Sequence, residues 1–323
     1  MMNLLFFQNC ISPHQIPYIR ECANDERVES VHLIVPRADY VVRKEMGWDS
    51  THLLDETLIR LWLKPTDEQV IQLLKEKENT ICLFSGIRAF AEIFSWFKLS
   101  LAYKVKRYII TEPPFVYSKP LWMHYLRFFI QDYKYVPYID GIFGFGDLAV
   151  RYYRNISKKW KVFPFQYVTE TIQRKLPPPM GKVKLLFVGS LIPRKNVQIV
   201  MEALEDNPEI DFTLIGDGSE RMILEKIAQR YQVRANFLGI MSMSEVSKIM
   251  QKNDVLILPS LYDGWGAVVN EAMSLGLYVI VSDRCGAKAL ILDESDGLIF
   301  KSRNDRALKD SLNFVVAHIK DIR

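Results

Sequence analysis

Short apolar runs alternate with amphipathic segments along the whole chain, which is the pattern of parallel strands connected by helices. In the first half, the runs that predict buried strands are residues 2–7, 28–35, 80–84, 107–110 and 162–165. In the second half they are residues 183–188, 211–215, 234–238, 255–258 and 278–282. This alternation predicts an α/β fold in which each half forms a doubly wound, Rossmann-like sheet.

Segments with helical spacing of apolar residues lie between these strands. The predicted helices are residues 18–23, 147–153, 197–204, 220–231, 243–251 and 306–319. Residues 58–61 and 70–77 also have a pattern of apolar residues, but this pattern does not decide between a strand and a helix. The glycines at 141, 144 and 146 have the wrong spacing for a dinucleotide-binding loop, so we interpret 141–147 as a strand that runs into a helix.

Three consecutive prolines at 177–179 separate the two halves. Proline-rich segments form stiff, extended connections, and a new strand follows directly. We therefore predict an N-terminal domain over 1–176 and a C-terminal domain over 177–323, facing each other across a central cleft.

The stretch 256–282 predicts one strand-loop-helix-strand unit with two carboxylates. Asp263 lies in the loop, and Glu271 lies in the helix that opens near Gly266. Ligands of parallel sheets bind beyond the carboxyl ends of the strands, so both carboxylates face the expected site. Glycine lets the backbone approach a ligand, and the helix start at Ala267 and Val268 offers amides to an anion. This unit predicts a site for a ligand with both phosphate and hydroxyl groups.

A second loop, Gly189 to Asn196, also follows a predicted strand and carries Arg194 and Lys195. Two cations at that place can neutralise a diphosphate and stabilise it as a leaving group. The alternative is a solvated surface pair.

These motifs resemble the donor site of family 4 glycosyltransferases, which have the GT-B architecture of two Rossmann-like domains. In that family an acid, a Gly-aromatic-Gly turn and a Glu eight positions on precede a small-residue helix, as at Asp263–Glu271 here. The resemblance implies that Gly189 and Lys195 meet the diphosphate and that Glu271 meets the ribose. It also implies that backbone groups of Ile240 or Met241 lie beside the base.

The sequence departs from the family pattern at three positions. Asp263 stands where Glu is usual, Ser190 where Arg is usual and Asn196 where Gly is common, so Arg194 takes the place of the missing Arg. The resemblance further implies transfer with retention of configuration, in which Asp263 holds the sugar or stabilises its reacting carbon. The alternative for Glu271 is compensation of the helix dipole.

Two residues of the first half are candidates for contact with the acceptor. His14 follows the first predicted strand, and Glu112 follows the strand at 107–110. A carboxylate there can orient or deprotonate an acceptor hydroxyl. The alternatives are a surface loop histidine and a loop carboxylate that caps a neighbouring helix.

Composition excludes several classes of protein. The chain has 323 residues, 49% of them hydrophobic, without an apolar run of the roughly 18–20 residues that span a bilayer or a leader-like start. We therefore expect a cytoplasmic protein. The net charge of +4 is too small to indicate a nucleic-acid partner. Cys10, Cys22, Cys82 and Cys285 lie far apart, which favours reduced thiols over a zinc site or disulfides.

Residues 94–161 are rich in both cations and aromatic side chains. This mixture suits a peripheral contact with an anionic membrane, at the inner face of the plasma membrane. The alternative is a set of ordinary helices with aromatic inner faces and solvated basic backs.

We therefore expect a glycosyltransferase that uses a nucleotide-sugar donor of the UDP or GDP type. Its acceptor is expected to be a glycan or a polyprenyl-linked hydroxyl in cell-surface polysaccharide (lipopolysaccharide or capsule) biosynthesis. No Asp-x-Asp pair occurs, so we expect no metal and no other cofactor. A phosphorylase or nucleotide-sugar hydrolase is the enzymatic alternative. The other alternative is a non-catalytic nucleotide-sugar-binding or scaffold subunit.

Overall fold

The computed structural model describes residues 1–40, 54–55, 57–75, 79–169, 181–205 and 207–318. The chain divides into two compact units, Met1–Val168 and Thr169–Arg323, which are described separately below. The predicted domain boundary between residues 176 and 177 lies outside the described residues.

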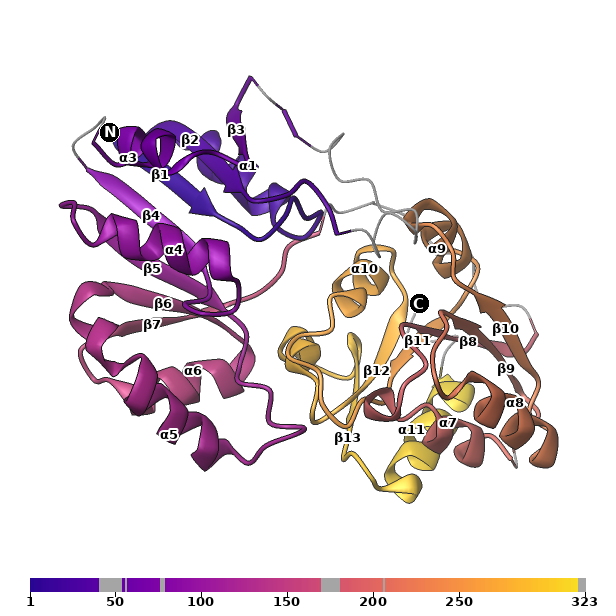
Figure 1. Ribbon diagram of the computed structural model, residues 1–323. Coiled ribbons are helices and arrows are strands. Elements are labelled where there is room, and N and C mark those ends of the chain that lie inside the picture. Colours follow the sequence, from indigo (N-terminus) through magenta and orange to yellow (C-terminus); the bar gives the residue numbers. More distant parts are fainter. Residues whose placement is uncertain (41–53, 56, 76–78, 170–180, 206, 319–323) are drawn as a thin grey trace. The chain divides into compact units, whose positions relative to one another are not determined.

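Unit 1 contains a seven-stranded parallel sheet in the order β3-β2-β1-β4-β5-β6-β7 (Figure 1). Its strands are β1 (Met2–Phe7), β2 (Val28–Val35), β3 (Ile59–Leu63), β4 (Thr80–Ser85), β5 (Lys106–Thr111), β6 (Gly141–Phe145) and β7 (Lys161–Phe165). Its helices are α1 (Ile16–Ala23), α3 (Asp67–Lys75), α4 (Ala91–Ser100), α5 (Leu121–Gln131), the 3-10 helix η2 (Tyr133–Tyr138) and α6 (Gly146–Ile156).

The strand order of unit 1 reverses between β1 and β4, which pair with each other in parallel. Right-handed crossovers therefore place α1, which follows β1, on the opposite face from α4, α5 and α6, which follow β4, β5 and β6. The core between β1, β4 and α4 is aromatic: the Phe7 and Phe84 rings stack with centroids 4.6 Å apart, and Phe97 meets Phe84 edge-on at 5.3 Å. Aromatic rings thus fill the interior of unit 1 between β1, β4 and α4.

Unit 2 contains a six-stranded parallel sheet in the order β10-β9-β8-β11-β12-β13. Its strands are β8 (Val183–Val188), β9 (Ile210–Ile215), β10 (Ala235–Gly239), β11 (Val255–Leu258), β12 (Tyr278–Ser282) and β13 (Gly297–Phe300). Its helices are α7 (Gln198–Ala203), α8 (Arg221–Arg230), α9 (Met243–Met250), α10 (Val268–Ser274), α11 (Asp305–His318) and the 3-10 helices η3 (Pro193–Lys195) and η4 (Gly286–Leu290).

The predicted fold, two parallel α/β units with Rossmann-like winding, is confirmed. The predicted strand-to-helix run at 141–147 corresponds to β6 followed by α6. Residues 58–61 and 70–77, for which the sequence does not decide between strand and helix, correspond to β3 and α3. Among the described strands and α-helices, β13 at the edge of the second sheet and α4 and α5 within the basic, aromatic stretch were not predicted.

The sequence explains where several helices begin. The side chain of Ser242 accepts a hydrogen bond from the Glu245 amide while Glu245 reaches back to the Ser242 amide, a capping box that starts α9. Helix α1 begins two residues earlier than predicted and has Pro17 in its first turn, where a missing amide costs nothing.

All four cysteines are free thiols, and Cys10, Cys82 and Cys285 are buried. None of the described helices is both long enough and apolar enough to cross a membrane. Within the described residues no group of three or more His, Cys, Asp and Glu side chains is arranged to hold a metal ion.

Candidate functional site

The strand order of unit 2 reverses between β8 and β11, and the predicted phosphate and sugar residues follow these two strands. Arg194 and Lys195 form η3 after β8, and Asp263 lies in the loop after β11. In open parallel sheets the crevice at such a reversal is where ligands bind. The topology therefore brings together residues that are far apart in the sequence, at the place where a binding site is expected.

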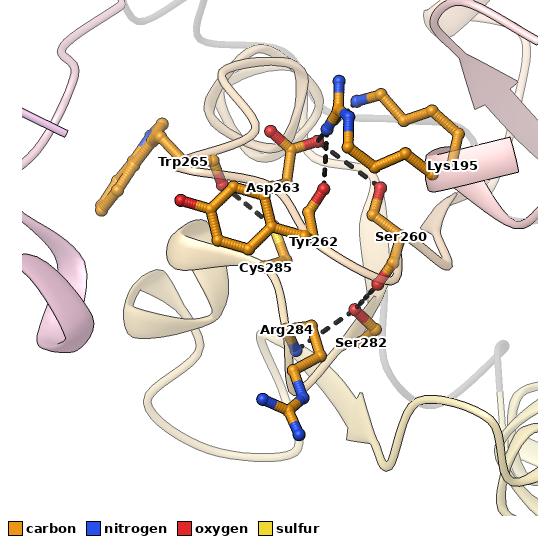
Figure 2. Close-up of polar contacts among 9 residues, drawn as sticks. Lys195, Ser260, Tyr262, Asp263, Trp265, Ser282, Arg284 and Cys285 are labelled. Carbon is orange, nitrogen blue, oxygen red and sulfur yellow. Dashed lines mark hydrogen bonds and ion pairs between the residues drawn. The ribbon is translucent and has the colours of Figure 1, made fainter. Parts of the chain in front are cut away.

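Lys195 and Asp263 form an ion pair at this reversal, with Nζ 2.5 Å from Oδ2 (Figure 2). The side chains are 13% and 14% exposed. Arg194 contributes a second cation, its Nη1 3.8 Å from the same carboxylate oxygen. The alternative of a solvated surface pair is wrong, because both cations point into the protein and share one carboxylate.

Backbone contacts hold the two loops together. Arg194 Nη1 donates to the Tyr262 carbonyl at 2.6 Å, and the Leu261 amide donates to the Arg194 carbonyl at 2.8 Å. Asn196 ends η3 with a left-handed backbone, φ 53° and ψ 39°. Asparagine tolerates this conformation better than most residues, so it can stand where the family has glycine.

The far side of Asp263 is anchored to the loop after β12. The Asp263 amide donates to the Arg284 carbonyl at 3.1 Å, and the Gly286 amide donates to the Asp263 carbonyl at the same distance. Cys285 Sγ lies 2.9 Å from the Trp265 carbonyl oxygen (Figure 2). Burial is the main reason why the pKa of this thiol is raised to about 12. The main chain of Asp263 is therefore held by the loop after β12, and its carboxylate is held by Lys195.

Close backbone packing explains two glycines of the site. A Cβ on Gly216, which follows β9, would lie 2.1 Å from the Gly189 carbonyl oxygen, so the loops after β8 and β9 meet main chain to main chain. Gly266 has φ 96° and would clash with Leu258 and Cys285 if it carried a Cβ. Both positions require glycine, because a side chain there would prevent the close approach of neighbouring atoms.

Helix α10 begins at Val268, with Ala267 as its N-cap residue, as the sequence predicts. The first amides of a helix have no partner within the helix. Glu271 lies in its first turn, and burial raises the pKa of its carboxyl to about 7. Burial that favours the neutral carboxyl weakens the compensation of a helix dipole, which was the alternative for Glu271.

Ile240 and Met241 follow β10, the edge strand on the other side of β9 and β8. β10 lies three positions from β11 in the sheet, which corresponds to about 14 Å at the usual strand spacing. A ligand that reaches both Ile240 and Asp263 must therefore be elongated, as a nucleoside diphosphate sugar is.

In unit 1, the structure links both acceptor candidates through Tyr167, which was not predicted. The Tyr167 hydroxyl donates to Glu112 Oε1 at 2.9 Å, and its ring lies 5.7 Å from the ring of His14. His14 is 7% exposed, so the alternative of a surface histidine is wrong. Tyr167 lies two residues before Thr169, where unit 2 begins. The sequence alone does not reveal it, because these two partners follow two different strands that are far apart along the chain.

Comparison with known sequences finds matches for the second unit. Residues 168–319 match the family model of group 1 glycosyl transferases. An uncharacterized glycosyltransferase of Methanocaldococcus jannaschii is 33% identical over 132 residues, which are 39% of this chain and 36% of that protein. The UDP-Gal:alpha-D-GlcNAc-diphosphoundecaprenol alpha-1,3-galactosyltransferase of Escherichia coli is 32% identical over 124 residues, 35% of this chain and 31% of that protein. These alignments span about a third of each relative's length.

Comparison with solved structures covers nearly the whole chain. The apo form of the lipopolysaccharide outer core galactosyltransferase WaaB has a TM-score of 0.72 at 15% identity, covering 99% of this chain and 94% of that one. HepE of Anabaena in complex with UDP has a TM-score of 0.70 at 13% identity, covering 100% and 93%. The chain thus has the GT-B fold, and its second unit matches the family model of group 1 glycosyl transferases.

Proposed function

We propose that the protein transfers a sugar, with retention, from a nucleoside diphosphate sugar to a hydroxyl of a glycan or a polyprenyl-linked acceptor. The donor is of the UDP or GDP type, and the reaction belongs to cell-surface polysaccharide biosynthesis. The protein acts at the cytoplasmic face of the membrane and needs no metal.

The observation that carries this proposal is the arrangement of Arg194, Lys195 and Asp263 at the strand reversal of unit 2. Two cations and one carboxylate leave a local charge of +1, which an incoming diphosphate neutralises. Because these groups are largely removed from water, their attraction to phosphate is stronger than at an exposed surface. The amides at the start of α10 add donors for the same anion.

The names of relatives support the choice of donor and acceptor. HepE was solved with UDP, and the Escherichia coli relative is named for a UDP-sugar donor and a diphosphoundecaprenol-linked acceptor. We extend both to this chain as part of the proposal. The base and the sugar are recognised in loops that follow β10 and β11, where Ile240 and Asp263 lie.

The proposed reaction breaks the bond between the sugar anomeric carbon and the diphosphate. The electron pair leaves with the phosphate oxygen, whose charge Arg194 and Lys195 stabilise. Asp263 stabilises the positive charge that develops on the sugar. The acceptor hydroxyl attacks the same face of the sugar and gives its proton to a general base, for which Glu112 and His14 are the candidates that the sequence offers.

Calorimetric titration with UDP and GDP in the presence of EDTA tests the donor site directly. We expect one nucleotide to bind, and Lys195→Ala to weaken it by about 1–3 kcal/mol, the loss of a charged hydrogen bond. Lys226→Ala, an exposed lysine on α8, is the matched control and should bind as the wild type does. If neither nucleotide binds, or if both variants behave alike, the proposed donor site is wrong.

Turnover separates transfer from the other uses of this fold. A donor that is consumed only when a hydroxyl acceptor is added supports the transferase. Donor consumption by water alone would indicate a hydrolase, and nucleotide binding without any turnover would indicate a non-catalytic binding subunit.

A further inference from the structure

Helix α5 of unit 1 is apolar on both of its faces. Its inner face contains Phe128, which is buried and meets Trp160 edge-on with ring centroids 5.8 Å apart. Tyr125 packs against Tyr152 at 4.7 Å, and the Tyr152 hydroxyl donates to the His124 carbonyl at 3.0 Å. These contacts attach the helix firmly to α6 and to the residue before β7.

The outer face of α5 is as apolar as the inner face, but it faces solvent. Most exposed large apolar side chains described in unit 1 lie between residues 115 and 138. Those on the helix and directly after it are Trp122, Met123, Leu126, Phe129, Ile130 and Tyr133. Trp122 is 64% exposed and Ile130 is 74% exposed. Their spacing is that of a single helical face, which we call the α5 outer face.

The exposed charges between residues 113 and 139 have one sign. Lys119, Arg127 and Lys134 are exposed, and the only acid between residues 113 and 139 is Asp132. Asp132 is buried and forms an ion pair with Arg88, so it does not oppose the cations at the surface. A helix with apolar side chains on opposite faces is normally covered on both of them. The exposed cations beside the α5 outer face favour an anionic partner.

We infer that the α5 outer face docks on an anionic lipid bilayer, with the helix lying in the plane of the interface. Trp122 and Ile130 enter the boundary between headgroups and acyl chains, and the three cations meet lipid phosphate. This inference deepens the proposed function. It rests on that function in one respect, namely that the acceptor is linked to a lipid. It assigns the membrane contact, predicted from the composition of residues 94–161, to one helix.

Flotation with vesicles of phosphatidylcholine alone, or of three parts phosphatidylcholine to one part phosphatidylglycerol, tests the inference without any sugar donor. We expect the full chain to float with the anionic vesicles and to remain behind with the neutral ones. The double variant Trp122→Ser/Ile130→Ser should lower the partition coefficient at least tenfold. The matched control is Met222→Ser/Ile223→Ser, two exposed apolar residues on α8, which should float as the wild type does.

Charge variants and lipid quenching separate insertion from adsorption. Each of Lys119→Gln, Arg127→Gln and Lys134→Gln should lower partition into anionic vesicles about fivefold. The triple variant Lys226→Gln/Lys248→Gln/Lys301→Gln, exposed lysines of unit 2, is the control. Brominated lipids should quench tryptophan fluorescence in the wild type, and Trp122→Phe should remove most of that quenching.

Three outcomes would overturn the inference. The protein could stay out of anionic vesicles, or the α5 and control variants could bind them equally. Light scattering could instead show a dimer in solution that Trp122→Ser converts to a monomer, in which case a second copy covers the face. Calorimetric nucleotide binding, measured on the same variants, should be unchanged, so loss of membrane binding and failure of the donor site are distinguishable.

Discussion

Lys195 Nζ lies 2.5 Å from Asp263 Oδ2, although the two residues are 68 positions apart in the sequence. The cation that is proposed to bind the donor diphosphate is thus paired with the carboxylate that is proposed to meet the sugar. Arg194 shares the same carboxylate oxygen. A diphosphate must therefore compete with Asp263 for both cations, and this competition has measurable consequences.

Removing the charge of Asp263 should separate nucleotide affinity from transfer. In Asp263→Asn the two cations lose their protein counter-charge, so we expect the nucleoside diphosphate alone to bind about five- to tenfold more tightly. Transfer should fall by about a hundredfold, because the charge that stabilises the reacting sugar is gone. Calorimetry and donor turnover measure the two effects.

The control for this variant is Asp217→Asn, which removes an exposed acid 2.9 Å from Arg221 and should leave both quantities close to wild type. If Asp263→Asn binds the nucleotide more weakly than the wild type does, the carboxylate supports phosphate binding instead of competing with it.

Stability should fall with rising pH because of Glu271. Burial raises the pKa of this carboxyl to about 7 in the folded protein, above its value of about 4.3 in an unfolded chain. At a pH between these two pKa values, the folded state binds the proton more tightly than the unfolded state does. The contribution of Glu271 to the free energy of unfolding is therefore complete below pH 4 and is lost as pH rises through 7. The change is on the order of 3 kcal/mol.

Urea unfolding at pH 5, 6, 7 and 8 checks this expectation, and Glu271→Gln should abolish the slope that the wild type shows. Glu245→Gln is the control. Hydrogen bonds from Ser242 lower the pKa of Glu245, so this carboxyl stays ionised over the whole range and its removal cannot change the slope. Equal slopes in the wild type and Glu271→Gln would exclude the raised pKa.

Nucleotide binding should release a proton from Glu271 near pH 6.5. If ribose hydroxyls donate to this carboxyl, they favour its ionised form and lower its pKa on binding. Affinity should then increase between pH 6 and 8. Calorimetry in two buffers of different ionisation enthalpy measures the proton, and Glu271→Gln should release none. Proton uptake instead of release would mean that Glu271 binds the nucleotide in its protonated form.

The sequence was sufficient for most of the strands and for placing Lys195 and Asp263 after two of them. Apolar runs such as 183–188 and 255–258 have few alternatives to a buried strand, and parallel sheets place ligands beyond their carboxyl ends. From these two facts Lys195 and Asp263 could be placed at one edge of one sheet. That they form an ion pair depends on the strand order β8-β11, which the pattern of apolar residues does not encode.

The features that were not predicted depend on contacts between distant residues. β13 is short, with only Gly297 and Phe300 buried, so its pattern is too weak to identify an edge strand. The sequence of α5 shows that it is apolar, but not which side of it the sheet of unit 1 leaves open. Tyr167 has an ordinary sequence context, and its importance arises from partners 55 and 153 positions away.

The link from Tyr167 to Glu112 predicts a positioning role that affects turnover and not donor binding. Tyr167→Phe keeps the ring against His14 and removes only the hydroxyl that donates to Glu112. This hydrogen bond is exposed, so we expect a modest loss of about three- to tenfold in kcat, with the affinity for nucleotide unchanged. Tyr138→Phe, an exposed tyrosine of the same unit, is the matched control.

A double-mutant cycle decides whether Tyr167 acts through Glu112. If it does, Tyr167→Phe should have no further effect on kcat in a Glu112→Gln background, because the interaction is already lost. Additive effects would show that the two residues act independently, and the positioning role would be wrong. Weaker nucleotide binding in Tyr167→Phe would contradict a role that is confined to turnover.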